Sequence, residues 1–581
     1  MTAQALLFGN KPVDRFLRWF AVRPGLTLTL AVLAALGPFI TKPFNIDDPM
    51  SIWVARQIQA HPANPYGYEV NWFGFVSPMS EVSTNPPLSC YYLAMAAAIL
   101  GWSEPALHFA FLLPAVAAIL GTYRLARHFC GRPLLAACAT LFTPAFLVCG
   151  TTLMCDTLTS AFWVWAIVLW VEGMERDDFW RLAGSGLLMA LAALTKYFGA
   201  CLIPLLATYS LTGQRRIGRC AGCLLIPIAA LAAYQWATYA LYGKGLLSSA
   251  VDWTMTTKAA SGVSVAASGL TALAFTGGCL AVATFLAPLL WRTRVLVGFA
   301  TGVVLFAAVL FIENTMLKKY DSLSGISRTD LEVQIVFWAV GGVSVLGLAV
   351  ADVWHWRDPR SCLLALWVFG AFLFTAFVNW AVNGRSILPM APAVGILLAR
   401  RLEQGALTGK NPRQWDVLIC LVVGAALALL VARADFLFAT AVRQSAERTH
   451  AKYGRGRETL WFEGHWGFQY YMEKLGSKAV ATRQSVAKQG DFLAIPLNNT
   501  NVYPPDRKYA LLLEVLSIHG PRWLTTTSDQ VGAGFHSSVW GPLPFVFGRV
   551  PPERVFMYVI GPTPPISQAV GLRDTNVNAS Q

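Results

Sequence analysis

Charged residues are scarce in this chain. Asp, Glu, Lys and Arg make up 13% of its 581 residues, whereas hydrophobic residues make up 55%. A soluble protein carries about 25% charged residues, so the composition excludes an ordinary soluble domain and indicates a polytopic membrane protein. The formal net charge of +14 would suggest nucleic acid in a soluble protein. Here Lys and Arg retained in cytoplasmic loops explain it, and we expect no nucleic-acid partner.

Cysteine is absent after Cys420, and the N-terminal segment lacks a small-residue cleavage site. The part of the chain after Cys420 can therefore form no internal disulfide, even in an oxidising compartment. The eleven cysteines lie mostly in or beside apolar segments, as small buried hydrophobic residues do. Cys220 and Cys223 have the C-x-x-C spacing, but no second pair or His cluster nearby indicates a metal site. The missing cleavage site predicts that the apolar run 24–40 is retained as a first helix.

Long apolar runs, by contrast, are numerous. A helix needs about 20 apolar residues to cross the hydrocarbon core of a bilayer. The sequence therefore predicts an α-helical polytopic membrane protein. We expect about thirteen transmembrane helices, at residues 24–41, 105–123, 133–150, 157–172, 181–195, 197–212, 219–240, 268–290, 295–312, 333–351, 362–381, 386–400 and 415–433.

The apolar stretch 88–100 decides the orientation of the later helices. It is too short to span and is bounded by Pro86-Pro87 and Gly101. If it does not cross, the Arg-rich loops that follow all lie on the cytoplasmic side with the basic N-terminal segment, as the positive-inside rule requires. We therefore predict a cytoplasmic N-terminus and an outer loop at 42–104, in which 88–100 is a juxtamembrane helix at the outer interface.

Everything after Arg433 then faces outward. We expect a transmembrane domain at 1–433 and an extracytoplasmic domain at 434–581. The second domain is more polar and has short apolar runs at 492–496, 510–513 and 555–559. Such runs predict strands, so this part is interpreted as a small α/β domain outside the plasma (inner) membrane.

Five ionisable residues lie at the outward ends of the predicted helices: Asp47, Asp48, Asp156, Lys196 and Arg385. Ionisable groups close to hydrocarbon are costly unless paired or hydrated, so each is a candidate functional residue. A carboxylate can accept a proton from a hydroxyl or amine, and Lys and Arg can hold a phosphate. This combination suits group transfer from a phosphorylated lipid, because preplaced cations stabilise the charge on a leaving phosphate.

Each of these residues also has a simpler interpretation. Asp47 and Asp156 can cap the helices that follow them, Lys196 can extend to the interface, and Arg385 can be an ordinary loop charge. A divalent cation is a possible cofactor, with Asp47, Asp48 and Asp156 as its candidate ligands. Carboxylates without His ligands do not distinguish Mg²⁺, Mn²⁺ or no metal at all.

Aromatic and polar residues nearby are further candidates for substrate contact. Tyr66 and Trp72 can stack on a sugar, or they can belong to the aromatic belt at the membrane interface. His465 lies in the aromatic-rich segment 461–471. That segment can contact the acceptor, or it can form the core of the outer domain.

Together these motifs resemble those of the bacterial members of the glycosyltransferase C superfamily, in particular the protein O-mannosyltransferase and aminoarabinose transferase group. The family pattern has an acidic pair after the first helix, a Lys-Pro-Pro-Leu-like turn, a Met-x-Asp corner, a Leu-x-Lys turn and an Arg-Tyr-x-x-Pro-x-x-Pro segment. The resemblance covers roughly residues 10–400. The matching segments are Asp47-Asp48-Pro49, Asn85-Pro86-Pro87-Leu88, Met154-Cys155-Asp156, Leu194-Thr195-Lys196-Tyr197 and Arg385-Ser386-Ile387-Leu388-Pro389-Met390-Ala391-Pro392.

The resemblance implies a membrane glycosyltransferase that moves a sugar from a polyprenyl-phosphate carrier to an envelope acceptor, generally with inversion. Asp47 would be the general base or would orient the acceptor. Asp48 and Asp156 would support it, and Lys196 and Arg385 would stabilise the leaving lipid phosphate.

Three departures from the family pattern bear on the donor. Asn85 stands where the family has a Lys implicated in holding the lipid phosphate, and Ser386 stands where it has Tyr. The Arg that usually follows the acidic pair is absent, since Met50 and Ser51 follow Pro49. Lys196 and Arg385 are therefore expected to carry more of the phosphate contact, with Asn85 as a possible substrate contact.

The alternative functions are a transporter or flippase of a lipid-linked glycan and a non-catalytic scaffold. Transporters usually place charges near the bilayer midplane and often contain internal repeats, whereas these charges sit at helix ends and no repeat is evident. A scaffold would not need carboxylates and cations gathered at one face. The donor sugar and the class of acceptor (lipid, glycan or protein) stay open.

Overall fold

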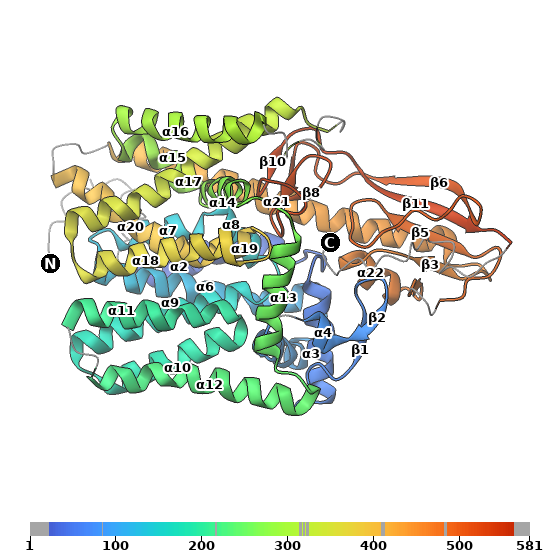
Figure 1. Cartoon of the computed structure of the whole chain (residues 1–581), viewed down its shortest axis with the longest axis horizontal. Coiled ribbons are helices and arrows are strands. Elements are labelled where there is room, and N and C mark those ends of the chain that lie inside the picture. Colours follow the sequence, from blue (N-terminus) through green and yellow to red (C-terminus); the bar gives the residue numbers. More distant parts are fainter. Residues whose placement is uncertain are drawn as a thin grey trace.

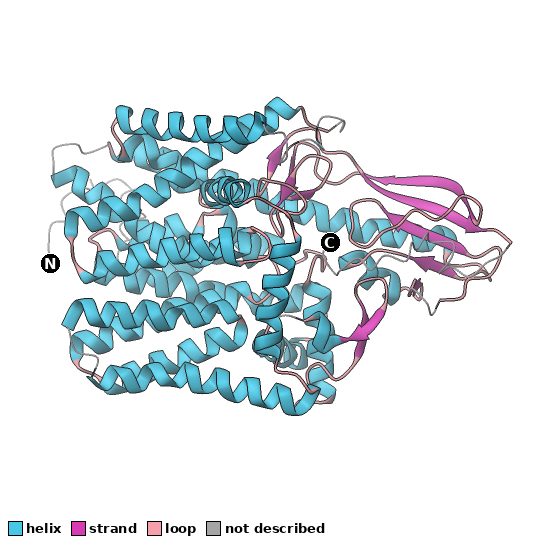
Figure 2. Ribbon diagram, viewed as in Figure 1, coloured by secondary structure: helices cyan, strands magenta, loops and turns pink. Residues whose placement is uncertain are grey.

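The computed structural model describes residues 23–83, 85–214, 218–312, 317, 320, 325–407, 413–481 and 485–562. Helices packed side by side form one part of the molecule, and a part that contains strands extends from one end of them (Figures 1 and 2). The polytopic helical architecture expected from the apolar runs and the strand-containing C-terminal part are both confirmed.

Seven helices of the described residues are long and apolar enough to cross a membrane. Two bent pairs raise the count to nine if each is one span: α7 (Pro133–Leu141) with α8 (Pro144–Gly150), bent by 61°, and α13 (Leu246–Ala260) with α14 (Val265–Cys279), bent by 110°. The number thirteen stays a prediction. The seven long helices are α6 (Glu104–Phe129), α9 (Asp156–Arg176), α12 (Gly218–Tyr242), α16 (Thr293–Ile312), α17 (Arg328–Trp356), α18 (Pro359–Leu373, continued by the π-helix η5, Phe374–Val378) and α21 (Gln414–Tyr453).

Several expected spans correspond to shorter apolar helices. These are α2 (Pro24–Leu36) with η2 (Gly37–Phe39), α10 (Phe179–Thr195), and η3 (Tyr197–Cys201) with α11 (Leu202–Gln214). The expected span 386–400 is built from α19 (Gly384–Ile387), η6 (Leu388–Met390) and α20 (Ala391–Leu407).

The region 242–290 differs most from its expected form. The run expected as one span at 268–290 is divided at Leu280 into α14 and α15 (Ala281–Leu290). The segment before this run contains α13, which lies across the ends of neighbouring helices (Figure 1). Its mixture of Ser, Thr and apolar residues contains no long apolar run, so hydropathy alone did not indicate a helix here.

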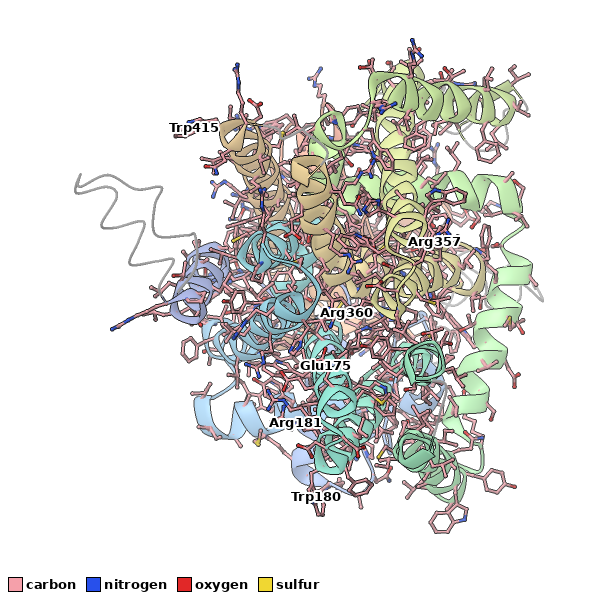
Figure 3. The ribbon with its side chains drawn as sticks, turned by 90° about the vertical axis from the view of Figure 1, so that its left-hand side faces the viewer. Glu175, Trp180, Arg181, Arg357, Arg360 and Trp415 are labelled. Atoms are coloured by element: carbon pink, nitrogen blue, oxygen red, sulfur yellow. The ribbon has the colours of Figure 1, made fainter. Side chains whose placement is uncertain are left out.

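The end of the bundle away from the C-terminal part carries Arg181, Arg357 and Arg360 (Figure 3). Trp180 and Trp415 lie at the same end and are 81% and 72% exposed. Arg and Trp at the ends of apolar helices are typical of a membrane–water interface.

The residues after α21 form a five-stranded sheet in the order β4-β3-β5-β11-β6. Strands β3 (Leu460–Phe462), β4 (Lys478–Ala479) and β5 (Phe492–Pro496) pair in parallel, and β11 (Glu553–Ile560) lies antiparallel between β5 and β6 (Ala510–Ile518). The strands expected at 492–496, 510–513 and 555–559 are thus found. Helix α22 (Trp466–Lys474) follows β3, and two small ribbons pair β7 (Leu524–Thr525) with β10 (Val546–Phe547) and β8 (Thr527–Ser528) with β9 (Ala533–Gly534).

Helix α21 continues through residue 433, where the boundary between the two domains was expected. The division at 433/434 therefore stays a prediction, and the structure joins the two parts by an unbroken helix.

The outer loop lies between the helices and the C-terminal part (Figure 1). It contains α3 (Asp48–Ala60), the hairpin β1 (Glu69–Asn71) with β2 (Val76–Pro78), α4 (Met79–Val82) and α5 (Leu88–Leu100). Helix α5 has the bounds expected for the juxtamembrane helix. Apolar side chains of the loop share one buried cluster with α22 and β11, among them Phe44, Ile52, Trp72, Phe468 and Met557.

Candidate functional site

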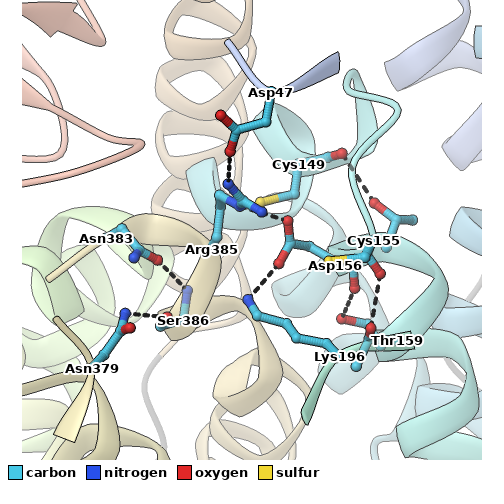
Figure 4. A network of polar contacts seen from close by, with 12 residues as sticks. Asp47, Cys149, Cys155, Asp156, Thr159, Lys196, Asn379, Asn383, Arg385 and Ser386 are labelled. Carbon is cyan, nitrogen blue, oxygen red and sulfur yellow. Dashed lines mark hydrogen bonds and ion pairs between the residues drawn. The ribbon is translucent and has the colours of Figure 1, made fainter. Parts of the chain in front are cut away.

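Four of the five charged residues singled out in the sequence form one network (Figure 4). Asp47 directly precedes α3, and Asp156 is the first residue of α9. Lys196 lies between α10 and η3, and Arg385 is the second residue of α19. Each side chain is therefore held at the end of a helix, and four separate segments of the chain meet at this point.

The network alternates in charge. Arg385 donates from Nη1 to Oδ2 of Asp47 at 2.7 Å and from Nε to Oδ2 of Asp156 at 2.8 Å. Lys196 Nζ donates to the other oxygen of Asp156 at 2.7 Å. Arg385 thus bridges two carboxylates, and Asp156 is held between two cations.

The four side chains of the network differ in exposure, with Asp47 the most exposed and Asp156 the most buried. The side chain of Asp47 is 37% exposed, those of Lys196 and Arg385 are 15% and 13% exposed, and that of Asp156 is 2% exposed. Burying charges is tolerated when each is paired and hydrogen-bonded. The two cations keep Asp156 ionised and fixed, whereas Asp47 is the carboxylate that solvent or a substrate can reach.

The backbone before Asp47 takes an unusual conformation. Ile46 has a φ of 52°, in the left-handed region, and its side chain is buried. A β-branched residue rarely adopts this conformation, and such backbone strain occurs most often at functional sites. It turns the chain so that the neighbouring Asp47 and Asp48 point in different directions.

Asp48 lies apart from the charged network. Its carboxylate is fully buried and accepts the backbone N–H groups of Leu153 at 2.8 Å and Asn45 at 3.2 Å. Burial raises the pKa of Asp48 to about 6, an effect that the nearby charge of Lys42 partly offsets. Asp48 therefore anchors the loop that leads to Asp156, and a catalytic role for Asp48 stays a prediction.

Arg385 is held by the residues around it. Asn383 Oδ1 accepts the backbone N–H of Ser386 at 2.8 Å and so caps α19. Asn379 Nδ2 donates to Ser386 Oγ at 3.1 Å (Figure 4). Ser386 is thus part of the structure that orients the Arg385 segment.

Of the other candidate contacts, Tyr66 and Trp72 lie in the buried cluster that the segment 42–104 shares with the C-terminal part. Tyr66 is 2% exposed and donates its hydroxyl to the backbone oxygen of Asn85 at 2.7 Å. Trp72 packs against the His465 ring at 5.4 Å, and burial lowers the pKa of His465 to about 4. Among the described residues, no hydrogen bond or ion pair joins Tyr66, Asn85, Trp72 or His465 to the four charged residues. Trp72 and His465 are buried against one another, as expected if segment 461–471 forms a core.

The candidate metal ligands are not grouped as a metal site. Among the residues that the structure describes, no three His, Cys, Asp or Glu side chains lie together in an arrangement suited to a metal ion. Arg385 itself supplies the positive charge between Asp47 and Asp156.

A second buried charge pair was not anticipated from the sequence. Lys42 Nζ contacts Asp435 of α21 and lies 3.3 Å from Thr151 Oγ1. From the C-terminal part, Thr526 donates its hydroxyl to Asp435 at 2.7 Å, and His536 Nε2 lies 3.4 Å from it. The sequence offered one signal for this pair, because Asp435 lies close to an apolar run, where an ionisable residue is costly without a partner. Nothing in the neighbouring sequence indicates that this partner is Lys42.

Residues 84–236 match the family model of dolichyl-phosphate-mannose-protein mannosyltransferases. This match confirms the resemblance to the glycosyltransferase C superfamily over that segment, which includes Asn85, Asp156 and Lys196. No curated protein matches the chain in sequence.

Three solved structures align with this chain at low sequence identity. The oligosaccharyltransferase of Archaeoglobus fulgidus, in complex with Zn and sulfate, aligns with 79% of this chain at 14% identity and a TM-score of 0.46. ArnT of Cupriavidus metallidurans, bound to undecaprenyl phosphate, aligns with 82% at 14% identity and a TM-score of 0.41, over 93% of its own length. The arabinofuranosyltransferase AftD from Mycobacteria aligns with 94% at 13% identity and a TM-score of 0.39, over 40% of its length. This chain spans 62% of the length of the archaeal enzyme.

Proposed function

We propose that this protein is a membrane glycosyltransferase that transfers a sugar from a polyprenyl-phosphate-linked donor to an acceptor on the outer face of the plasma membrane. The observation that carries the proposal is the bridge from Asp47 through Arg385 to Asp156 and Lys196. It places an exposed carboxylate beside two cations at the ends of apolar helices. The family model matched by residues 84–236 supports the same class of donor.

The reaction is a single displacement at the anomeric carbon of the donor sugar. A hydroxyl or amine of the acceptor attacks this carbon and gives up its proton to the carboxylate of Asp47. The bond between the anomeric carbon and the phosphate oxygen breaks, and the phosphate leaves with the electron pair. The products are the glycosylated acceptor, the polyprenyl phosphate and a protonated Asp47, and the configuration is inverted.

Arg385 and Lys196 supply the charge that stabilises the leaving phosphate. Negative charge grows on the phosphate as the bond breaks, and cations that are already in place stabilise it without reorganisation. Because Arg385 Nη1 also contacts Asp47, a phosphate on this guanidinium would lie near the base.

Asp156 acts as a positioning residue. Both of its oxygens are engaged, one by Arg385 and the other by Lys196, and it is almost fully buried. It holds Arg385 and Lys196 at a fixed separation, so these two cations do not have to rearrange when the donor binds. Asp48 positions the loop before Asp156 through the backbone N–H of Leu153.

The residues at the two ends of the helix bundle support one orientation of the protein in the membrane. The arginines at the end of the bundle away from the C-terminal part (Figure 3) support a cytoplasmic location for that end. The charged network would then lie on the outer side with α5, and the C-terminal part would be extracytoplasmic. The acceptor would be a component of the cell envelope, namely a lipid, a glycan or a protein.

The test uses the full chain in liposomes with a panel of radiolabelled polyprenyl-phosphate sugars and envelope extract as acceptor. Release of polyprenyl phosphate is measured for the wild type, for Asp47→Asn and for Asp252→Asn. Asp252 is an exposed carboxylate on α13 outside the network, so its variant is a matched control. We expect the wild type and the control to release the carrier from one donor, and Asp47→Asn to be slower by about 100-fold or more.

Two outcomes would contradict the proposal. Full turnover by a folded Asp47→Asn variant would exclude this carboxylate as the base. Movement of label across the bilayer without release of carrier from any donor would instead favour a transporter.

A further inference from the structure

The C-terminal part of the chain contacts the backbone directly before both members of the Asp47–Arg385 pair. We propose that it is a positioning element for the site, with α22 holding the segment before Asp47 and residues 533–541 holding the segment before Arg385. The catalytic consequence rests on the proposed function, whereas the contacts themselves can be tested without it.

Helix α22 holds residues 44 and 45. The backbone N–H of Phe44 donates to the hydroxyl of Tyr471 at 3.0 Å, and the N–H of Gly467 donates to Asn45 Oδ1 at 3.3 Å. The approach is so close that a Cβ on Gly467 would lie 2.3 Å from the backbone oxygen of Phe44. The strained Ile46 comes next in the chain, so this contact fixes the turn that presents Asp47.

Residues 533–541 hold the chain before Arg385 in a similar way. The backbone N–H of Gly384 donates to the oxygen of Phe535 at 2.8 Å. Ser538 both donates its N–H to the oxygen of Val382 at 2.8 Å and accepts the N–H of Val382 on its hydroxyl at 3.1 Å. A Cβ on Gly384 would lie 2.6 Å from the Phe535 ring, so the two segments pack without room to shift.

The two contacts are joined to each other. Trp466, the first residue of α22, packs against Trp540 with ring centroids 4.9 Å apart. Trp466 has a φ of 60°, a left-handed conformation that a bulky residue rarely adopts. The C-terminal part therefore holds the segments directly before Asp47 and Arg385 as one packed unit, and the separation of the base from the phosphate-binding cation depends on it.

Hydrogen exchange of two single amides tests the contacts directly. In Tyr471→Phe the amide of Phe44 loses its acceptor, and in Ser538→Ala the amide of Val382 loses its acceptor. We expect each amide to exchange about five- to tenfold faster in its own variant. Ser538→Thr should restore the protection of Val382. Tyr503→Phe and Ser517→Ala, at exposed side chains of the C-terminal part, should change neither amide.

Kinetics separate a positioning role from a purely structural one. Tyr471→Phe should lower kcat with little change in the KM for donor, because it displaces the base. Ser538→Ala should mainly raise the donor KM, because it displaces Arg385, and Ser538→Thr should reverse this effect. In Trp540→Leu, which removes the connection, we expect faster exchange at both amides.

The outcomes distinguish failure of this inference from failure of the proposed function. Unchanged exchange at both amides, in variants that unfold at the wild-type temperature, would overturn the inference whatever the activity. Faster amide exchange in a variant that keeps the wild-type kcat and KM would overturn the positioning role. In Trp540→Leu, faster exchange at Val382 but not at Phe44 would show that the two contacts are independent of one another. If the wild type turns over no donor, the proposed function fails while the exchange measurements still decide the contacts.

Discussion

Arg385 Nη1 lies 2.7 Å from Oδ2 of Asp47, although the two residues are 338 positions apart in the sequence. The proposed base and the proposed phosphate-binding group are therefore partners of one another before any substrate is bound. A donor phosphate that reaches Arg385 has to share the guanidinium with Asp47 or displace it. This competition makes binding and turnover respond differently to changes at the same residue.

Removing the charge of Asp47 should strengthen binding of the carrier while it abolishes turnover. In Asp47→Asn the guanidinium no longer has a carboxylate at Nη1. Because a partly exposed ion pair contributes about 0.2 to 1 kcal/mol, we expect polyprenyl phosphate to bind up to about fivefold more tightly. The measurement is the Kd of polyprenyl phosphate in detergent, with Asp252→Asn as control. Weaker binding in Asp47→Asn would show that Arg385 does not hold the phosphate.

Asp156 should matter for stability as well as for activity. Asp156→Ala leaves Arg385 and Lys196 close together with their shared carboxylate removed. Breaking a buried ion pair by removing one partner costs about 3 to 5 kcal/mol, so we expect a clear fall in Tm in detergent. Adding Lys196→Met removes one of the unpaired charges. The double variant should therefore recover part of the Tm but none of the turnover, and a Tm for Asp156→Ala equal to that of the wild type would contradict the burial of this pair.

Much of the site could be predicted because its residues carry local signals. Asp47, Asp156, Lys196 and Arg385 each stand at the end of an apolar run, where an ionisable side chain is costly without a partner. The bounds of α5 and β5 follow from Pro, Gly and the length of an apolar run. These features depend on neighbours in the sequence, so they can be identified without a structure.

The rest depends on contacts between distant residues. The residue types alone do not show which partner Asp47 or Asp48 finds, and in the structure, after the left-handed turn at Ile46, Asp47 reaches Arg385 whereas Asp48 accepts the backbone N–H of Leu153. Similarly, Lys42 and Asp435 are 393 positions apart. Hydropathy also did not reveal the break at Leu280, because a change in chain direction leaves the apolar character of the run unchanged.

Lysine should not replace Arg385. The guanidinium contacts Asp47 and Asp156 through two different nitrogens at once, and the single ammonium group of Lys cannot reproduce this planar geometry. We expect Arg385→Lys to lower kcat/KM for donor by about 100-fold or more. Arg554→Lys, at an exposed position on β11, is the matched control. Activity of Arg385→Lys near that of the control would mean that charge alone is required at this position.

The C-terminal part should become less stable as the pH rises, because of Glu463. This side chain is buried and accepts the backbone N–H of Tyr503 at 2.7 Å, and burial raises its pKa from 4.5 to about 8. Between these values the folded state holds a proton that the unfolded state has released. The contribution to the free energy of unfolding is therefore complete below pH 4.5 and is lost as the pH rises through 8.

Glu463→Gln keeps an oxygen for the Tyr503 amide and has no carboxyl group to ionise. The variant should therefore gain stability relative to the wild type as the pH rises from 5 to 9, with the largest difference at pH 8 and above. The measurement is the Tm of the full chain in detergent across this pH range, with unfolding monitored by a probe in the C-terminal part. Glu458→Gln, at an exposed position, should follow the wild type at every pH. Parallel curves for Glu463→Gln and the wild type would mean that Glu463 titrates alike in the folded and unfolded chains.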